Sequence, residues 1–165
     1  MRVLGVDPGS VVCGYGVLEE VGGRLVHVDN GCIAPGRKGS FNDRLKDIYD
    51  GLSEMIERFG PDEVALEDSF FSRNVKSAIK LGQARGVCIL AALNAGLPVA
   101  EYPPMEVKQS VTGYGRADKS QVSKMVMTLL SLPEVAAEDA SDALAVAICH
   151  LNSRRLAVKI SGKSK

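Results

Sequence analysis

Four acidic residues stand at the ends of apolar segments, although they are far apart along the 165-residue chain. Asp7 follows the apolar run 3–6, and Glu67 follows the run 64–66. Asp139 and Asp142 open an alanine-rich apolar stretch. Carboxylates at strand ends and at a helix start can converge on one point, where they either repel one another or hold a hard cation such as Mg²⁺. This pattern therefore indicates a metal-dependent chemistry.

The ligand types narrow that chemistry. Oxygen ligands without thiolate or imidazole favour Mg²⁺ or Mn²⁺. Two such ions, about 4 Å apart, would activate water and stabilise the departing 3′ oxygen of a phosphodiester, so that no nucleophilic side chain is needed. Each acid also has a simpler explanation. Asp7 could be a turn residue, Glu67 a solvated strand end, and Asp139 a helix cap.

Whether the acids meet depends on the elements that carry them. The segments 2–7, 13–19 and 24–33 read as strands, and Gly22-Gly23 predicts a hairpin between the last two. Apolar residues that recur every three or four positions predict amphipathic helices in the rest of the chain. The further elements expected are strands at 63–67 and 98–102, and helices at 42–59, 74–95, 104–112, 118 or 120 to 130, and 139–154.

This order of elements predicts an α/β fold. Three antiparallel strands followed by β-α-β-α units give a mixed, five-stranded sheet with helices on both faces. The crossover through the helix 42–59 places the strand 63–67 beside the strand 2–7. Asp7 and Glu67 would then lie at the carboxyl ends of neighbouring parallel strands, where open α/β sheets bind their ligands.

Length and composition are those of one globular domain. We expect a nuclease domain at residues 1–153 and a basic, flexible tail at residues 154–165. The four cysteines have no close pair and no ligand spacing, which favours free thiols in a reducing compartment. Without a signal peptide or a long apolar stretch, the protein is expected to be cytoplasmic and not to bind membranes.

The formal net charge is zero, but the charges are unevenly distributed. Residues 1–68 contain 13 acidic and 7 basic side chains, whereas residues 69–165 contain 7 acidic and 13 basic ones. Such asymmetry is typical of chains that bind a polyanion, although an ordinary solvated surface would also explain it.

Four short motifs occur in a fixed order: Asp7-Pro-Gly-Ser, Lys80-Leu-Gly-Gln-Ala-Arg-Gly-Val, Lys119-Ser-Gln-Val and Asp139-Ala-Ser-Asp-Ala-Leu-Ala. Together they resemble the RuvC family of crossover (Holliday) junction endodeoxyribonucleases, over residues 1–152. The resemblance implies a ribonuclease-H-like fold and a homodimer that makes symmetric nicks in two strands of a four-way DNA junction. It also implies roles in recombination and repair, beside the branch-migration proteins RuvA and RuvB.

The resemblance assigns roles to individual residues. It implies that Asp7, Glu67, Asp139 and Asp142 are the catalytic, Mg²⁺-binding acids; some family members have His at the position of Asp139. An aromatic side chain after the second acid would contact a base, and here this is Phe70 or Phe71. Further DNA contacts are expected from Lys108 and Lys119 by resemblance, and from Arg73, Lys76 and Lys80, whose helical spacing also fits a solvated face.

Gly82 and Gly86 lie four residues apart in the helix predicted at 74–95, where each glycine costs about 1 kcal/mol relative to alanine. Close approach of another backbone usually compensates for this. By resemblance, this helix forms the dimer contact; the alternative is close packing within one subunit.

Three other functions are compatible with parts of the sequence. An enzyme that processes structured RNA would use the same fold, but no residue pattern indicates recognition of a 2′-hydroxyl. The Asp7-Pro-Gly-Ser start also resembles the phosphate loop of actin-like ATPases and sugar kinases, which need two lobes and therefore a longer chain. A junction-binding scaffold without catalysis would not need all four acids.

Overall fold

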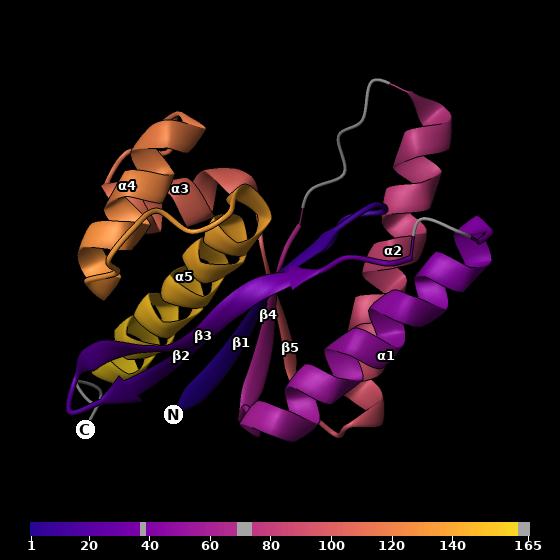
Figure 1. The fold of residues 1–165 in the computed structure, drawn as a ribbon. Helices are drawn as coiled ribbons and strands as arrows, with labels where there is room; N and C mark the ends of the chain where they lie inside the picture. Colours follow the sequence, from indigo (N-terminus) through magenta and orange to yellow (C-terminus); the bar gives the residue numbers. More distant parts are fainter. Residues whose placement is uncertain (37–38, 69–73, 162–165) are drawn as a thin grey trace.

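The computed structural model describes residues 1–36, 39–68 and 74–161, with side chains described as far as residue 158. The described chain forms a sheet flanked by helices (Figure 1). The strands are β1 (Arg2–Asp7), β2 (Cys13–Val21), β3 (Arg24–Ile33), β4 (Glu63–Glu67) and β5 (Val99–Tyr102). The helices are α1 (Phe41–Phe59), α2 (Val75–Asn94), α3 (Pro104–Thr112), α4 (Lys119–Leu130) and α5 (Glu138–Ser161).

The strand order is β3-β2-β1-β4-β5, and the predicted position of β4 beside β1 is confirmed. β1, β2 and β3 pair antiparallel, whereas β4 runs parallel to both β1 and β5. Within the parallel pair, Val6 of β1 is level with Leu66 of β4. Asp7 and Glu67 are the next residues along, so the register brings the two acids side by side at the end of the sheet.

Local signals explain where the helices begin and end. Ser40 caps α1 in a capping box with Asp43, and Gly60 ends the helix in the left-handed conformation. Asp118 caps α4 through a second capping box, with Gln121. These caps lie within one or two residues of the predicted boundaries.

Helices cover both faces of the sheet, in agreement with the predicted layers. α1 and α2 pack on one face, against a core that includes Leu4, Val6 and Leu66. α3, α4 and α5 lie on the other face, where Val3 and Ala65 contribute to a second core (Figure 1). The residues from Ala143 to Leu151 are all buried, which makes α5 the central helix of its layer.

Three glycines allow α5 to lie directly on β1 and β2. A Cβ atom added at Gly5 would be 2.1 Å from the carbonyl oxygen of Ala143, and one at Gly14 would be 2.0 Å from that of Asp139. At Gly16, an added Cβ would be 2.7 Å from the Leu144 side chain. The helix backbone thus occupies the space that side chains would fill, and this brings the start of α5 close to Asp7.

The last helix is longer than predicted: the prediction ended it near Arg154, and α5 extends to Ser161. Two ion pairs tie this region to the sheet. Arg154 contacts Glu63 at 3.0 Å, and Arg155 donates from Nε to Glu20 at 2.7 Å. These partners are remote in sequence, so the polar segment looked like a frayed end. None of the helices in the described ranges is long and apolar enough to span a bilayer.

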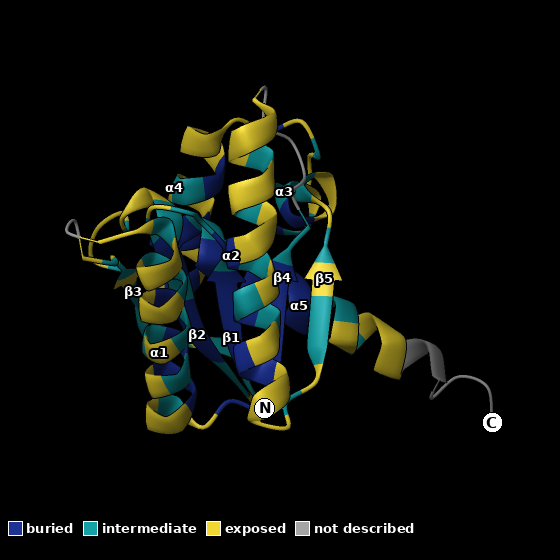
Figure 2. Cartoon of the chain, turned by 90° about the vertical axis from the view of Figure 1, so that its right-hand side faces the viewer, coloured by how far each residue is buried: buried dark blue, intermediate teal, exposed yellow. Residues whose placement is uncertain are grey.

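The outer face of α2 carries an apolar stripe, which we define as Val75, Ile79, Gly82, Gly86, Leu90 and Leu93. The four large residues of the stripe are 51–75% exposed. Figure 2 shows that exposed residues recur along α2. A Cβ at Gly82 or Gly86 would meet nothing within 4 Å in the described part of the chain. Close packing within one subunit therefore does not explain these two glycines.

Candidate active site

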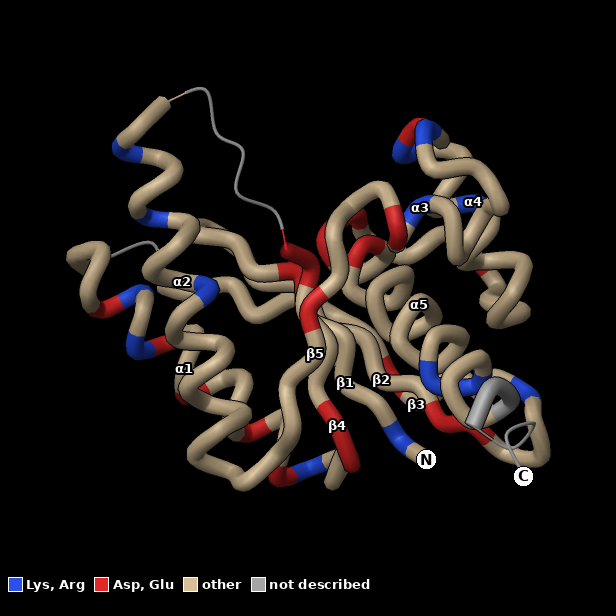
Figure 3. The backbone as a smooth tube through the Cα atoms, turned by 180° about the vertical axis from the view of Figure 1, so that it is seen from behind, with Lys and Arg blue, Asp and Glu red and all other residues tan. Residues whose placement is uncertain are grey.

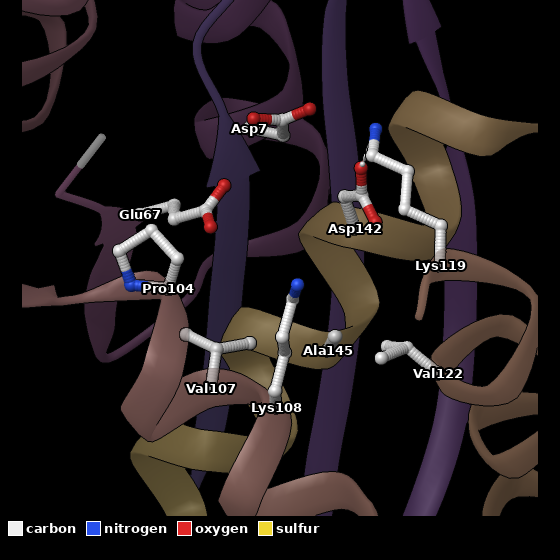
Figure 4. A pocket seen from close by; sticks show the side chains of 9 residues that line it. All are labelled: Asp7, Glu67, Pro104, Val107, Lys108, Lys119, Val122, Asp142 and Ala145. Carbon is white, nitrogen blue, oxygen red and sulfur yellow. Dashed lines mark hydrogen bonds and ion pairs between the residues drawn. The ribbon is translucent and has the colours of Figure 1, made fainter. Parts of the chain in front are cut away.

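A cavity of about 340 Å³ opens at the carboxyl ends of β1 and β4. Three of the predicted acids and two of the predicted lysines line it: Asp7, Glu67, Asp142, Lys108 and Lys119. Figure 4 shows the carboxylates of Asp7 and Glu67 on one side of the cavity and Asp142 across from them, beside Lys119. Side chains from five elements thus meet here: β1, β4, α3, α4 and α5.

Each acid is placed by a different part of the fold. Parallel pairing puts Asp7 next to Glu67. Asp142 lies near the start of α5, and the contact between Gly14 and the Asp139 backbone holds that start against the sheet. Negative charge near a helix N-terminus is favourable, so the position of Asp142 costs little in the helix itself.

Asp139 is placed differently from the other three. It is half-buried at the start of α5 but does not line the cavity with them. Its charge nevertheless reaches the site, since it raises the pKa of both Asp7 and Asp142. Asp139 is therefore an electrostatic neighbour of the cavity in this arrangement.

Crowding and burial shift the ionisation of these carboxyls. Burial, followed by the charges of Asp142, Glu67 and Asp139, raises the pKa of Asp7 to about 7. Burial is also the main cause of the raised pKa of Glu67 and of Asp142, and Lys119 opposes both shifts. Mutual repulsion on this scale is typical of sites built to receive a cation.

These shifts predict how stability changes with pH. Because the pKa of Asp7 is raised, its contribution to stability is fully present below about pH 4 and is lost as the pH rises through 7. In the absence of metal, we expect Asp7→Asn to be more stable than wild type by roughly 1–3 kcal/mol at pH 8, and by less at pH 5.5.

Urea unfolding with a chelator at both pH values measures this difference. Comparing the two proteins is necessary because burial lowers the pKa of His150, so that His150 contributes the opposite slope. If the gain from Asp7→Asn were equal at the two pH values, the pKa of Asp7 would not be raised.

Lys119 connects the acid cluster to the start of α5. Its ammonium group donates to Glu138 at 2.6 Å and to Asp142 at 3.1 Å. The hydrogen bond to Glu138 is the largest cause of the raised pKa of Lys119. Glu138 was not among the predicted site residues. Its position directly before Asp139 could have indicated that it lies beside the acid cluster.

The donor set fits Mg²⁺ or Mn²⁺ by its chemistry. Asp7, Glu67 and Asp142 offer only carboxylate oxygens, and their raised pKa values reflect a need for positive charge. In their present conformations, no three or more His, Cys, Asp or Glu side chains among the described residues are arranged closely enough to hold an ion. The side chains would therefore have to turn towards a common centre on binding.

Two of the other predicted DNA contacts, Lys76 and Lys80, do not line the cavity. Lys76 and Lys80 are exposed on α2, and the Lys80 ammonium lies 5.2 Å from the centre of the Phe41 ring. Figure 3 shows basic segments on α2 on one side of the acidic strand ends, and on α3 and α4 on the other. Phe70, Phe71 and Arg73 lie outside the described residues, so their roles stay predictions.

A second group of charges lies beside the site and was not predicted. Arg85 of α2 contacts Asp68, the residue after Glu67, and Glu101 of β5. One signal was available in the sequence, since Arg85 is a charged residue in the otherwise apolar or small-residue segment 84–92. Its partners depend on strand pairing and are not visible locally.

Comparisons with known proteins identify the family of the chain. The family model for the crossover junction endodeoxyribonuclease RuvC matches residues 3–150. The crossover junction endodeoxyribonuclease RuvC of Pelobacter propionicus is 60% identical over 156 residues, which cover 94% of this chain and 89% of that protein. The protein of the same name from Geobacter sulfurreducens is 59% identical and covers 93% of each chain.

A solved structure extends the agreement to three dimensions. T. thermophilus RuvC, in complex with a Holliday junction substrate, superposes with a TM-score of 0.89. The two sequences are 35% identical, and the match covers 95% of this chain and 96% of the other. The predicted ribonuclease-H-like fold is thereby confirmed. The chain belongs to the RuvC family of crossover junction endodeoxyribonucleases.

Proposed function

We propose that this protein resolves four-way DNA junctions by paired, symmetric nicks, with metal-activated water as the nucleophile. The observation that carries the proposal is the cavity in which Asp7, Glu67 and Asp142 meet Lys108 and Lys119. Negative groups would hold the ions, and positive groups would hold the phosphate. A hydrolase needs both when its substrate is a polyanion.

Asp7, Glu67 and Asp142 would hold two Mg²⁺ ions, which Mn²⁺ could replace, with Asp139 assisting. When bound, the metal supplies a nucleophilic water at neutral pH and stabilises the leaving 3′ oxygen. The carboxylates of this chain orient that centre through the rigid ends of β1, β4 and α5. The raised pKa of Asp7 means that it must lose a proton before it can act as a ligand.

Lys119 and Lys108 have complementary parts in this proposal. Lys119 would neutralise Asp142 in the metal-free site. When a cation binds Asp142, Lys119 could keep its contact with the Glu138 carboxylate. Lys108 lines the same cavity and would contact a phosphate of the bound strand. Phe70 or Phe71, together with Arg73, Lys76 and Lys80, would extend the DNA contact beyond the cavity.

A synthetic four-way junction with each strand labelled in turn tests this function. We expect nicks at symmetric positions in two opposite strands, dependent on Mg²⁺, and little cleavage of linear duplex or of an RNA–DNA hybrid. Efficient cleavage of the hybrid would instead identify an enzyme acting on RNA. Tight junction binding without metal-dependent cleavage would identify a scaffold.

A homodimer follows from the same proposal. A junction has two equivalent strands to cut, and a two-fold protein matches a two-fold substrate. The apolar stripe on α2 is the surface that best fits a second copy of the chain, because its exposed side chains flank two glycines that allow close helix contact. RuvA and RuvB are further proposed partners, by family resemblance.

Gly86→Leu tests the dimer. A side chain at this position meets nothing in its own subunit, and leucine favours the helix, so the subunit should fold normally. We expect the dimer to dissociate at least ~30-fold more readily, by the usual cost of losing a central contact. Sedimentation velocity at micromolar concentration measures this.

Ser77→Leu is the matched control, since Ser77 is exposed on α2 outside the apolar stripe. It should leave the mass of the assembly unchanged. A wild-type protein that is monomeric at micromolar concentration and still makes paired nicks would refute the dimer.

A further inference from the structure

We propose that Arg85 is a positioning residue that holds the end of β4, and with it Glu67, from the face of the sheet opposite the cavity. The inference rests on the proposed function of Glu67 as a metal ligand. Arg85 does not line the cavity and has no part in the roles assigned above. It acts through the backbone that carries the acid.

The guanidinium of Arg85 is largely shielded from water, whereas its two partners are partly exposed. Arg85 donates from Nη2 to the Asp68 carboxylate at 2.9 Å, and the same nitrogen contacts the Glu101 carboxylate. The Arg85 side chain is 11% exposed, that of Asp68 34% and that of Glu101 40%. A largely buried guanidinium shared by two carboxylates restricts the positions of the strand ends that carry them.

The two carboxylates lie at the ends of neighbouring strands. Asp68 directly follows Glu67, and its backbone N–H donates to the Tyr102 carbonyl at 2.7 Å, next to Glu101. Arg85 therefore joins the final residues of β4 and β5 from outside the ladder. Any movement of Asp68 would move the backbone of Glu67 with it.

The alternation of side chains along β4 places the contacts of Arg85 with Asp68 and Glu101, here called the clamp, on the face of the sheet opposite the cavity. Ala65 faces the core under α5, whereas Val64 and Leu66 face the core under α1 and α2. Glu67 continues the α5 face and points into the cavity, while Asp68 meets α2. The acid and the clamp are thus on opposite sides of one strand end.

Arg85 also connects this strand end to the apolar stripe. It is followed by Gly86, whose missing side chain faces away from the subunit, and it is preceded by Ala84, which is fully buried. A shift of α2 on dimer formation would be transmitted by the guanidinium to the end of β4. Arg85 accordingly connects the proposed dimer surface to the residue that follows the proposed metal ligand Glu67.

Because Arg85 is positively charged, a positioning role and a purely electrostatic role predict opposite changes in cation binding. Removing a positive charge near the acid cluster should strengthen cation binding if only the field matters. If Arg85 positions Glu67, its removal should weaken cation binding. Arg85→Gln should therefore lower cation affinity if Arg85 positions Glu67, and raise it if only the field matters. Arg85→Lys keeps the charge but loses the planar guanidinium, so it should lower cation affinity only if Arg85 positions Glu67.

The experiment measures Mn²⁺ binding to the DNA-free full-length protein by calorimetry, together with kcat on a four-way junction and junction affinity in chelator. For Arg85→Gln and Arg85→Lys we expect Mn²⁺ affinity and kcat each to fall by about 10-fold, the usual effect of losing a residue that orients a metal ligand. Junction affinity without metal should stay within about 2-fold of wild type.

A matched control and a second variant keep the outcome clear. Lys46→Gln breaks an exposed ion pair with Asp50 on α1 and should change none of the three readings. If Arg85→Gln does not fold, Arg85→Lys alone decides. Unchanged or tighter Mn²⁺ binding by a folded Arg85 variant overturns the inference, whereas absent Mn²⁺ binding in the wild-type protein would overturn the proposed metal site instead.

Discussion

Asp7→Asn is expected to slow junction cleavage by at least ~10²-fold, the usual cost of removing one group that stabilises charge at the reacting centre. Asp7 has the most strongly shifted pKa among the three acids of the cavity, and it lies at the end of the central strand β1. The amide is nearly isosteric, so the fold should be unaffected. Only the charge and one ligand oxygen are lost.

Binding and cleavage should respond differently to this change. Junction affinity in chelator should be equal to wild type or higher, because one negative charge that repels phosphate is gone. Gel-shift titration and single-turnover cleavage measure the two quantities on the same junction. Glu54→Gln, an exposed acid on α1, is the control and should leave both unchanged. Full activity after Asp7→Asn would rule out the metal role of Asp7.

Gly14→Ala is expected to damage the site without touching any of its acids. The new Cβ would be 2.0 Å from the Asp139 carbonyl oxygen, a distance that real Cβ atoms do not adopt. The start of α5 must therefore move away from β2, taking Asp139 and Asp142 with it. We expect a loss of about 1–3 kcal/mol in stability from overpacking, and roughly 10²-fold in kcat from the displaced acid.

The control for this substitution is Gly31→Ala, in the neighbouring strand β3. There the new Cβ meets the Tyr15 ring, 2.9 Å away, and that side chain can turn aside. Thermal unfolding and single-turnover cleavage compare the two variants. Wild-type kcat in a folded Gly14→Ala protein would mean that the position of the α5 start does not limit catalysis.

The placement of Asp7 beside Glu67 could be predicted because it depends on two robust rules. A two-glycine hairpin fixed the antiparallel start of the sheet, and the right-handed crossover through α1 returned β4 to the free edge of β1. Both signals are local in sequence. The helical spacing of Asp139 and Asp142 predicted a shared face, but only Asp142 lines the cavity.

What could not be predicted depends on contacts between remote residues. α5 continues past Arg154, where Arg155 contacts Glu20, 135 positions earlier in the chain. Arg85 finds Asp68 and Glu101 only after β4 and β5 have paired. The position of Asp139 outside the cavity lining also depends on the backbone, because α5 packs closely against Gly14.

The dependence of the site on α5 also affects when, during synthesis, the acids can assemble. Asp7 leaves the ribosome well before Asp142 and the apolar residues of α5 that cover β1. Until that helix emerges, the sheet lacks the layer that closes one of its faces, and Asp7 has no partner across the cavity. The proposed metal site would therefore form only after α5 has been made.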